Sequence, residues 1–391
     1  MSRSAREFLH TPGPTHIPDR VLNAMHRQCL DLADPELETL AVSCFEDLKS
    51  MFRTSGEVFL YSSNGHGGWE AALANLFEPG DLVLVPEAGQ FSRGWAAHAE
   101  ALGLEVQATL GSWREALDPQ AVEDALRADG QGRIKAVLAV QTDTATGITS
   151  DLQAIRQAID ACGHPALLVA DVVASLAAAP FEMDAWGIDV AIGASQKALM
   201  GPPGLAMVAV SERTQALAAG KAGHRCYWDW RTRSQAELYR RFCGTVPEQA
   251  LFGLREALDI LAEEGLEAVI RRHARLAGAV QATVSVWAEA GALEFNALVP
   301  EQRSVSVTTV LVPEGVDAQA FRDFAREELK VALGGGLGPL EGKAFRIGHL
   351  GCLNEPMILG CLAGVETALL RRGIPHGEGG LRAAVESLAA G

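Results

Sequence analysis

The chain has 391 residues, 48% of them apolar, and a formal net charge of −16 at pH 7. The length allows about two to three domains, and the apolar fraction is sufficient for a large buried core. The acidic balance argues against a protein that binds nucleic acid or an anionic membrane surface, because both partners would repel the chain.

The seven cysteines are scattered, without a CxxC pair or a spacing typical of a metal site, so we expect neither a disulfide framework nor a bound metal. The first residues, MSRSAREFLH, contain no apolar segment typical of a secretion signal. No run of 18 apolar residues occurs in the chain. We therefore expect a cytoplasmic protein.

Short apolar segments alternate with amphipathic helical patterns between residues 57 and 211. Near-continuous apolar strands that alternate with helices are typical of a parallel sheet covered by helices on both faces. The pattern therefore predicts a three-layer α/β domain. The expected strands are residues 57–61, 81–85, 104–109, 134–140, 166–170, 189–193 and 205–210.

The alternation ends after these strands. Residues 219–247 are predicted to form an extended loop across the domain surface, and residues 248–290 have the leucine spacing of a helix. A smaller α+β unit is expected to follow. Its expected strands are residues 304–312 and 343–351, and its expected helices are residues 317–329 and 355–372.

The predicted fold class is therefore α/β, with a large three-layer domain, a mostly parallel sheet and a smaller C-terminal α+β domain. The helix that begins near Glu248 is expected to lead from one domain to the other. We place an N-terminal arm at residues 1–15, the large domain at 16–255 and the small domain at 256–391.

A glycine-rich turn, NGHGGWEAALANLF, follows the first expected strand and opens a helix. Ligands of open α/β sheets bind at the carboxyl ends of the strands, and a helix N-terminus favours an anion. Asn64, Gly65 and His66 could therefore hold a phosphate. The turn has neither the GK[ST] of a P-loop nor the GxGxxG of a dinucleotide site, so by itself it is better explained as a plain turn.

Two residues at strand ends add chemistry to this turn. Asp171 ends the apolar segment ALLVA, and Lys197 follows the next strand, 26 residues later, in GASQKALMGPPG. Taken singly, Asp171 can be a helix cap and Lys197 a surface residue. Together with an anion site they are what pyridoxal 5′-phosphate (PLP) requires: an amine for a Schiff base, a carboxylate that keeps the pyridine nitrogen protonated, and a phosphate cradle.

Six segments of the chain resemble, in order, the class V aminotransferases of PLP fold type I, and within them the serine/alanine–glyoxylate aminotransferase group. The segments are TPGPTHIP, NGHGGWEAAL, DVVAS, GASQKALMGPPG, TVPEQALFGLREAL and GKAFRIGHLG. The resemblance covers nearly the whole chain. It implies a PLP-dependent transaminase that moves an amino group from a small amino acid, serine or alanine, to glyoxylate or pyruvate.

The resemblance also implies roles for individual residues. Lys197 and Asp171 would be catalytic: Lys197 as the Schiff-base lysine that also moves the substrate proton, Asp171 as the partner of the pyridine nitrogen. Arg346 would hold the substrate α-carboxylate, and Gly13 lies in a segment that runs past the substrate. The cofactor-binding residues implied besides Lys197 and Asp171 are Asn64, Gly65, His66, Phe91, Thr144, Val173, Gln196 and Thr245.

Four of these cofactor residues have a more specific implied position. Phe91 takes the place of a stacking aromatic residue, Val173 packs under the ring, and Gln196 contacts the phosphate. Thr245 corresponds to a threonine that reaches the phosphate of the neighbouring subunit, which implies a homodimer with shared active sites. The residues themselves leave open whether Phe91 is an ordinary core residue and whether His349, which we leave out of the site, packs in the core or faces the pocket.

The family pattern is not complete, so several alternatives stay open. Leu32, Ala33, Phe242 and Gly244 stand where relatives carry other, often polar residues, which leaves room for a specialised donor such as aspartate, ureidoglycine or pyridoxamine. A PLP-dependent desulfurase or lyase is less favoured, because those relatives place histidine before the lysine and need a catalytic cysteine on a mobile loop. A PLP-binding regulator would need a DNA-binding segment, for which the sequence offers no candidate.

Overall fold

The structure is a computed structural model that describes residues 6–220 and 226–390. The larger part of the structure is built around a seven-stranded sheet. Strand β10 is antiparallel to both of its neighbours, and the other neighbouring strands pair in parallel. The strand order is β2 (Glu57–Ser62), β10 (Leu205–Val210), β9 (Val190–Ala194), β8 (Leu167–Asp171), β5 (Ile134–Val140), β3 (Leu82–Pro86) and β4 (Glu105–Thr109). The predicted α/β fold with a mostly parallel sheet is confirmed, and each expected strand lies within one residue of its predicted bounds.

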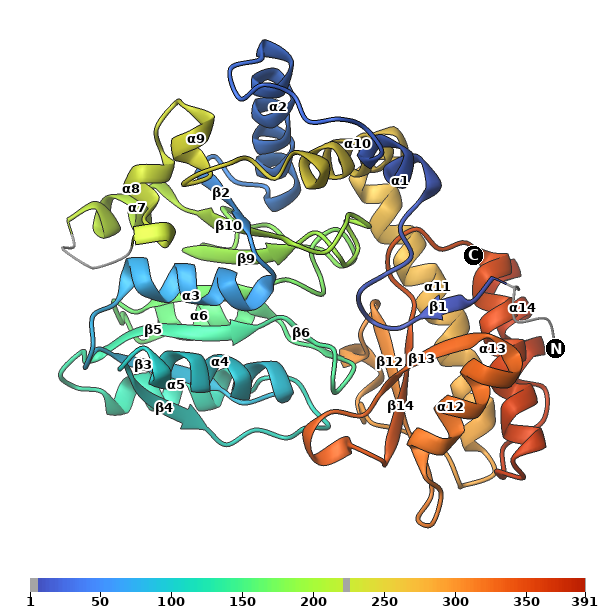
Figure 1. The fold of residues 1–391 in the computed structure, drawn as a ribbon. Helices are drawn as coiled ribbons and strands as arrows, with labels where there is room; N and C mark the ends of the chain where they lie inside the picture. The colour runs from blue at the N-terminus through green and yellow to red at the C-terminus, as the bar shows by residue number, and fades with distance from the viewer. Residues whose placement is uncertain (1–5, 221–225, 391) are drawn as a thin grey trace.

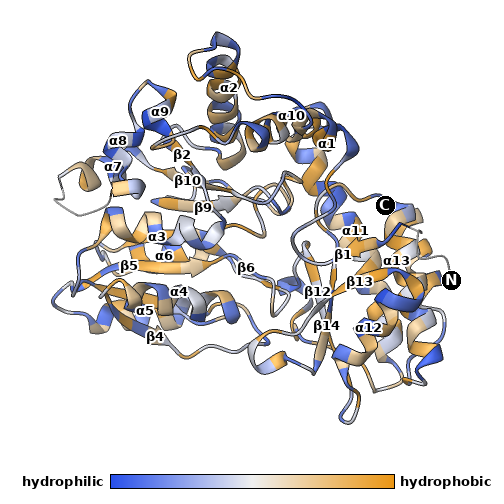
Figure 2. Cartoon of the chain, in the orientation of Figure 1, coloured by the Kyte–Doolittle hydropathy of each residue, from blue (hydrophilic) through white to orange (hydrophobic). Residues whose placement is uncertain are grey.

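Helices cover both faces of this sheet (Figure 1). The central strands β5 and β9 are hydrophobic (Figure 2), and successive residues of a strand pack into different cores, as Met207 and Val208 of β10 do. One core is closed by α2 (Pro35–Phe52), α5 (Pro119–Ala128), α6 (Leu152–Ala161) and α10 (Glu248–Glu264). The other is closed by α3 (Gly65–Leu76), α4 (Gln90–Ala101) and α7 (Glu212–Ala219).

A second, five-stranded sheet forms the core of the C-terminal part (Figure 1). Its order is β1 (Phe8–His10), β13 (Val331–Gly335), β14 (Ala344–Gly348), β12 (Val307–Leu311) and β11 (Glu294–Phe295). The helices of this core are α11 (Leu266–Ala288), α12 (Ala318–Leu329), α13 (Glu355–Arg371) and α14 (Gly380–Ala390). The edge strand β1 belongs to the N-terminal segment and pairs in parallel with β13.

The helix expected at residues 248–290 is two helices in the structure. The helices α10 and α11 meet at Gly265, whose φ of 83° lies in the left-handed region that glycine adopts without strain. The leucines at spacings of three and four residues all lie in α10, so their pattern did not reveal the break that follows.

Residues 219–247 differ from the extended surface loop that we predicted. The described part contains a 3₁₀ helix (Cys226–Trp228) and two short helices, α8 (Trp230–Arg233) and α9 (Leu238–Arg241). Trp230 and Arg233 are each only 2% exposed. The guanidinium of Arg233 donates to the carbonyls of Leu60 at 3.0 Å and of Arg241 at 2.8 Å, which anchors the segment to strand β2.

The remaining elements are short. They are α1 (Asp19–Met25), the hairpin of β6 (Thr142–Asp143) and β7 (Ile148–Thr149), and 3₁₀ helices at Pro300–Gln302 and Gly338–Leu340. Within the described ranges, no helix combines the length and the apolar character that crossing a membrane would require.

Candidate active site

A cavity of about 200 Å³ lies at the carboxyl ends of β8 and β9, where the first turn of α3 and the β6–β7 hairpin also meet. Parallel strands end at one edge of their sheet, so the polar residues that follow them are brought together there. The residues that line the cavity are Asn64, Gly65, His66, Trp69, Phe91, Thr142, Thr144, Asp171, Val173, Ala174, Gln196 and Lys197.

Asp171, the last residue of β8, is 4% exposed and is held by two hydrogen bonds. The indole Nε1 of Trp69 donates to Oδ2 at 2.8 Å, and the backbone N–H of Val173 donates to Oδ1 at 2.8 Å. Burial raises the pKa of Asp171 to about 6, while the two hydrogen bonds act in the opposite direction. A carboxylate fixed in this way favours a protonated nitrogen placed against it.

Lys197 follows β9 by three residues and extends into the same cavity. Its Nζ donates a hydrogen bond to the backbone oxygen of Pro12 in the N-terminal segment. Burial, and then the charge of Arg346, lower the pKa of Lys197 to about 8, while Asp171 and Asp143 raise it. Near neutral pH a larger share of this amine is therefore unprotonated than in an exposed lysine, and the neutral amine is the form that attacks a carbonyl.

The first turn of α3 forms another wall of the cavity. Asn64 caps the helix, since its side-chain oxygen accepts from the N–H of His66 at 3.1 Å. A Cβ atom at Gly65 would lie 2.9 Å from Cγ2 of Val173, so the close approach of the helix to this wall requires glycine. The Oε1 atom of Gln196 is buried and has no hydrogen-bond partner among the described residues. A helix N-terminus and an unpaired amide are thus available to a ligand, and the former favours an anion.

Phe91 and Val173 give the cavity its apolar surfaces. The ring of Phe91 lies edge-on to that of Trp69, with the centroids 6.4 Å apart and the planes at 72°. The backbone N–H of Phe91 donates to Oδ2 of Asp143 at 2.8 Å. An aromatic ring and a β-branched side chain in one small cavity suit a flat aromatic ligand.

Arg346 lies on β14, beside the cavity and not among the residues that line it. Its Nε donates to the carbonyl of Gly335 at 2.6 Å and its Nη1 to that of Thr144 at 2.7 Å. Within the described part of the chain, Nη2 forms no hydrogen bond and the side chain has no carboxylate within 4.0 Å. Burial lowers the pKa of Arg346 to about 10, so it remains a cation at neutral pH with one nitrogen available to a ligand.

The structure thus brings together nine of the ten residues that the sequence suggested for cofactor binding. The exception is Thr245, which is exposed and does not line this cavity. Gly13 lies against Lys197, because a Cβ atom there would overlap with Nζ. His349, which we left out of the site, is fully buried and contacts Thr308 Oγ1 at 2.9 Å and the carbonyl of Val305 at 2.9 Å, which makes it a packing residue of the second sheet.

Five residues at or beside the cavity were missed in the sequence: Pro12, Trp69, Thr142, Asp143 and Ala174. Trp69 lies within the segment NGHGGWEAAL, and Asp143 directly precedes Thr144, one of the suggested cofactor-binding residues. Each is a buried residue that acts on a neighbour, Trp69 on Asp171 and Asp143 on Phe91. Only the three-dimensional contacts distinguish such a residue from an ordinary helix or turn residue.

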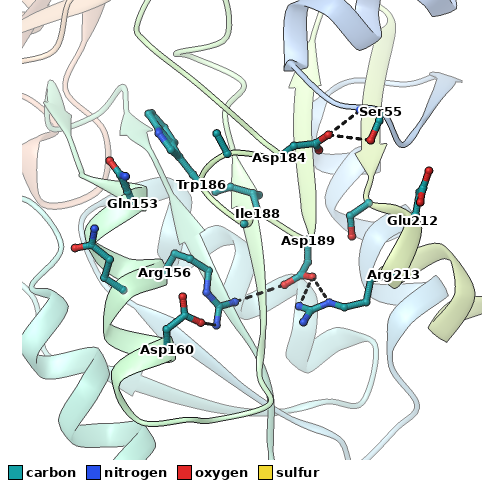
Figure 3. Close-up of a pocket in the computed structure, with 14 residues that line it drawn as sticks. Ser55, Gln153, Arg156, Asp160, Asp184, Trp186, Ile188, Asp189, Glu212 and Arg213 are labelled. Atoms are coloured by element: carbon teal, nitrogen blue, oxygen red, sulfur yellow. Dashed lines mark hydrogen bonds and ion pairs between the residues drawn. The ribbon is translucent and has the colours of Figure 1, made fainter.

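A larger cavity, of about 610 Å³, lies at the other edge of the same sheet, around residues that precede β9 and follow β10 (Figure 3). Four of its charged groups are already paired with one another. Asp189 accepts from Arg213 at 2.5 Å and lies 3.8 Å from Arg156, which in turn donates to Asp160 at 2.5 Å. Both arginines and two of the aspartates of this cavity are therefore already neutralised within the protein, and none of the cofactor-binding residues suggested by the sequence lines it.

The donor set of the smaller cavity fits one kind of ligand. It offers a helix N-terminus for an anionic group, apolar walls for a flat ring, a buried carboxylate for a basic ring nitrogen, and an amine that loses its proton more readily than an exposed lysine for a carbonyl carbon.

Comparison with known proteins gives consistent results. The family model described as aminotransferase class-V matches residues 7–339. Serine–glyoxylate aminotransferase of Methylorubrum extorquens is 44% identical over 95% of this chain and 93% of its own, and L-aspartate–glyoxylate aminotransferase of Paracoccus denitrificans is 38% identical over 93% and 91%. The crystal structure of pyridoxamine–pyruvate aminotransferase from Mesorhizobium loti superposes with a TM-score of 0.91 at 29% identity, covering 100% of this chain and 99% of that one.

Proposed function

The chain belongs to the class V aminotransferase family, and we propose that it is a PLP-dependent transaminase that moves the amino group of serine to glyoxylate. The observation that carries the proposal is the single cavity that gathers Lys197, Asp171 and the first turn of α3. Serine and glyoxylate are named first because the relative at 44% identity carries both in its name.

When bound, PLP would supply an aldehyde carbon that accepts and releases the amino group, and a ring that withdraws electrons from that carbon. Its phosphate would lie at the first turn of α3 with Gln196, and its ring between Phe91 and Val173. Asp171 would hold the proton on the ring nitrogen. This requires an ionised carboxylate, so activity should fall as the pH decreases through about 6, the pKa of Asp171.

Lys197 would move the proton of the reaction. Its amine would take the proton from the substrate Cα, hold it and release it again, a general acid–base role worth about 10²–10⁴-fold in rate. The carbonyl of Pro12, which accepts a hydrogen bond from Nζ, gives the amine a fixed acceptor when it is not bonded to the cofactor.

Arg346 would bind the α-carboxylate that amino donor and oxo-acid acceptor share. The guanidinium is held at two of its nitrogens by backbone carbonyls of Gly335 and Thr144, which leaves Nη2 for the substrate. A carboxylate bound at a fixed point orients the Cα–H bond of the substrate relative to the cofactor ring.

The amino donor is the less constrained of the two substrates. Leu32 is 38% exposed, and Ala33 is exposed. Phe242 is 2% exposed and packs 6.0 Å from the ring of Phe45, away from the cavity. Two relatives with different donors, serine and aspartate, share glyoxylate as acceptor. Alanine with glyoxylate or pyruvate, aspartate, ureidoglycine and pyridoxamine are therefore the alternatives to test beside serine.

A homodimer with shared active sites is part of the proposal, as is a cytoplasmic location. Thr245 supports the dimer, because this exposed residue does not reach the cavity of its own chain. In the proposed dimer it binds the phosphate in the partner's site.

Absorption spectra of the PLP-loaded protein test the function directly. Each amino acid is added singly, without an oxo acid. We expect serine to convert the cofactor to its pyridoxamine form and glyoxylate to reverse the conversion. Conversion by aspartate and not by serine would change the donor and keep the class, whereas no conversion by any amino acid would contradict the proposal.

A pair of lysine variants controls this measurement. Lys197→Ala should lose the covalent link to PLP and slow the conversion by about 10²-fold or more. Lys135→Ala removes an exposed lysine of β5 and should leave both unchanged.

A further inference from the structure

Asp143 is a buried carboxylate to which the proposed function assigns no role. It ends β6, is 1% exposed, and both of its side-chain oxygens accept backbone hydrogen bonds, Oδ2 from Phe91 at 2.8 Å and Oδ1 from Ala145 at 2.9 Å. A Cβ atom at Gly89 would lie 2.6 Å from Oδ2, so the loop before α4 closes directly onto this carboxylate. Asp143 therefore joins the start of α4, which carries Phe91, to the β6–β7 turn.

The four residues after Asp143 form a junction with the C-terminal part of the chain. Each of their backbone carbonyls accepts a hydrogen bond from a residue of that part. The pairs are Thr144 with Arg346 at 2.7 Å, Ala145 with Thr309 at 3.2 Å, Thr146 with Asn296 at 2.9 Å, and Gly147 with Ser304 at 2.9 Å. The turn is thus fixed by Asp143 on one side and by these four donors of the C-terminal part, Arg346 among them, on the other.

The charges around Asp143 are consistent with this arrangement. Three charged groups interact electrostatically with Asp143. They are Arg346 from β14, Lys197 after β9 and Asp171 of β8. Burial raises the pKa of Asp143 to about 6, and Arg346 acts against this rise. Near neutral pH the group is therefore mainly an anion, which balances the cation that Arg346 brings into the same buried region.

We propose that Asp143 is a positioning residue for the substrate carboxylate: it fixes the β6–β7 turn and, through the carbonyl of Thr144, the guanidinium of Arg346, while its charge supports the protonated forms of Arg346 and Lys197. The inference rests on the proposed function. It predicts that loss of the charge at residue 143 weakens the binding of both substrates and changes the proton affinity of Lys197.

The test is Asp143→Asn, which keeps the size of the side chain, removes its charge and replaces one of its two acceptor oxygens with an amide donor. We expect the KM values for amino donor and oxo acid to rise together by about tenfold or more, with a smaller change in kcat, because the shared carboxylate site is displaced. A second measurement does not depend on turnover: the rate at which PLP is incorporated into the cofactor-free protein as a function of pH. Its midpoint should move to lower pH, because the loss of a nearby anion disfavours the protonated amine of Lys197.

Asp189→Asn is the matched control. Asp189 is also a buried aspartate, 2% exposed, that accepts a backbone hydrogen bond, from Leu168 at 2.9 Å, and contacts arginine (Figure 3). It lies at the opposite edge of the same sheet. This variant should lose thermal stability while its KM values and the pH midpoint stay at the wild-type values. The inference would be overturned if Asp143→Asn kept the wild-type KM values and pH midpoint. It would also be overturned if these quantities changed equally in both variants.

A variant that does not fold is also informative. If Asp143→Asn is unstable because it leaves Arg346 unbalanced, then adding Arg346→Gln should restore part of the lost stability. A double variant that is no more stable than Asp143→Asn would overturn the inference. Failure of the proposed function is distinct from either result, since then the wild-type protein itself would show no PLP-dependent conversion.

Discussion

The behaviour of the Lys197 amine depends on a small set of buried groups. Burial and the charge of Arg346 lower its pKa, Asp171 and Asp143 raise it, and the result is about 8. The unfolded chain has no such environment, and there the pKa of Lys197 returns to the ordinary lysine value of 10.5. Below about pH 8 the folded protein therefore holds a charge that costs more in its cavity than in water.

We expect Lys197→Met to stabilise the cofactor-free protein more near pH 7 than near pH 10, relative to wild type. Between the folded pKa of about 8 and the unfolded value of 10.5, the unfolded state binds more protons, so wild-type stability rises with pH across this window. The advantage of the uncharged methionine should shrink by about 2 kcal/mol over the same range. Denaturant unfolding at both pH values measures this difference, and a difference independent of pH would show that the amine is not perturbed.

Trp69 offers a second test at the level of a single hydrogen bond. In Trp69→Phe, Asp171 loses the donor at Oδ2, so its pKa should rise further above the ordinary range. The acid limb of kcat/KM should then move to higher pH, and the Kd for PLP should increase by about tenfold, the value of one hydrogen bond to a charged group.

Trp95→Phe is the control for this substitution. Trp95 stacks on Trp69 with the centroids 5.6 Å apart and is fully buried, but its Nε1 has no hydrogen-bond partner among the described residues. The exchange removes the same atoms without breaking a hydrogen bond to Asp171. An equal shift of the acid limb in both variants would mean that aromatic packing, and not the bond to Asp171, sets the pKa.

At the residue scale, the sequence reveals the groups that act directly and not those that hold them. Lys197, Asp171 and the turn at Asn64 stand out because each follows an apolar strand and carries chemistry of its own. Trp69 and Asp143 carry no such signal, since a tryptophan in a helix and an aspartate in a turn are ordinary. Their roles arise from contacts with residues 102 and 52 positions away in the chain.

At the scale of elements, the large sheet could be predicted because its central strands are buried on both faces and are therefore apolar throughout. The second sheet was predicted in part. Strand β13, with the sequence VALGG, ends in glycines that weaken the strand pattern, and β1 has only three residues. The parallel pairing of these two strands joins residues more than 300 positions apart, so no local pattern records it.

The segment that follows β1 brings backbone to the reactive lysine, and Gly13 is the residue that permits this. Gly13 has a φ of 128°, and a Cβ atom there would overlap with Lys197 Nζ. We expect Gly13→Ala to displace the amine or the segment, and to slow PLP incorporation into the cofactor-free protein by about tenfold or more. The rate of the absorption change on adding PLP measures this effect.

Gly204→Ala separates backbone strain from the contact with Lys197. Gly204 has a similar φ of 120°, but no atom lies within 4 Å of a Cβ built there. It should lose about 1 kcal/mol of stability and incorporate PLP at the wild-type rate. If both variants are slowed equally, the effect of Gly13→Ala is one of strain alone.

At the scale of the whole molecule, the position of Thr245 matters most. The segment before α10 leaves Thr245 exposed, while the other suggested cofactor residues line one cavity. A residue with this position either plays no part in the site or serves the site of a second chain. The two cases differ in what happens when differently damaged subunits are combined.

We expect Lys197→Ala and Thr245→Ala subunits to complement each other when they are mixed in one dimer. Each variant alone should be impaired at subsaturating PLP, the first without its amine and the second with weakened phosphate binding. In a mixed two-fold dimer, one site receives both substitutions, and the other combines an intact Lys197 with an intact Thr245 from the partner. With random pairing, half of the dimers are mixed and half of their sites are complete, so about a quarter of wild-type activity should return. The mixture could instead be no more active than its Thr245→Ala subunits are by themselves. That result would place Thr245 outside the partner's site, and the proposed sharing of active sites between subunits would have to be abandoned.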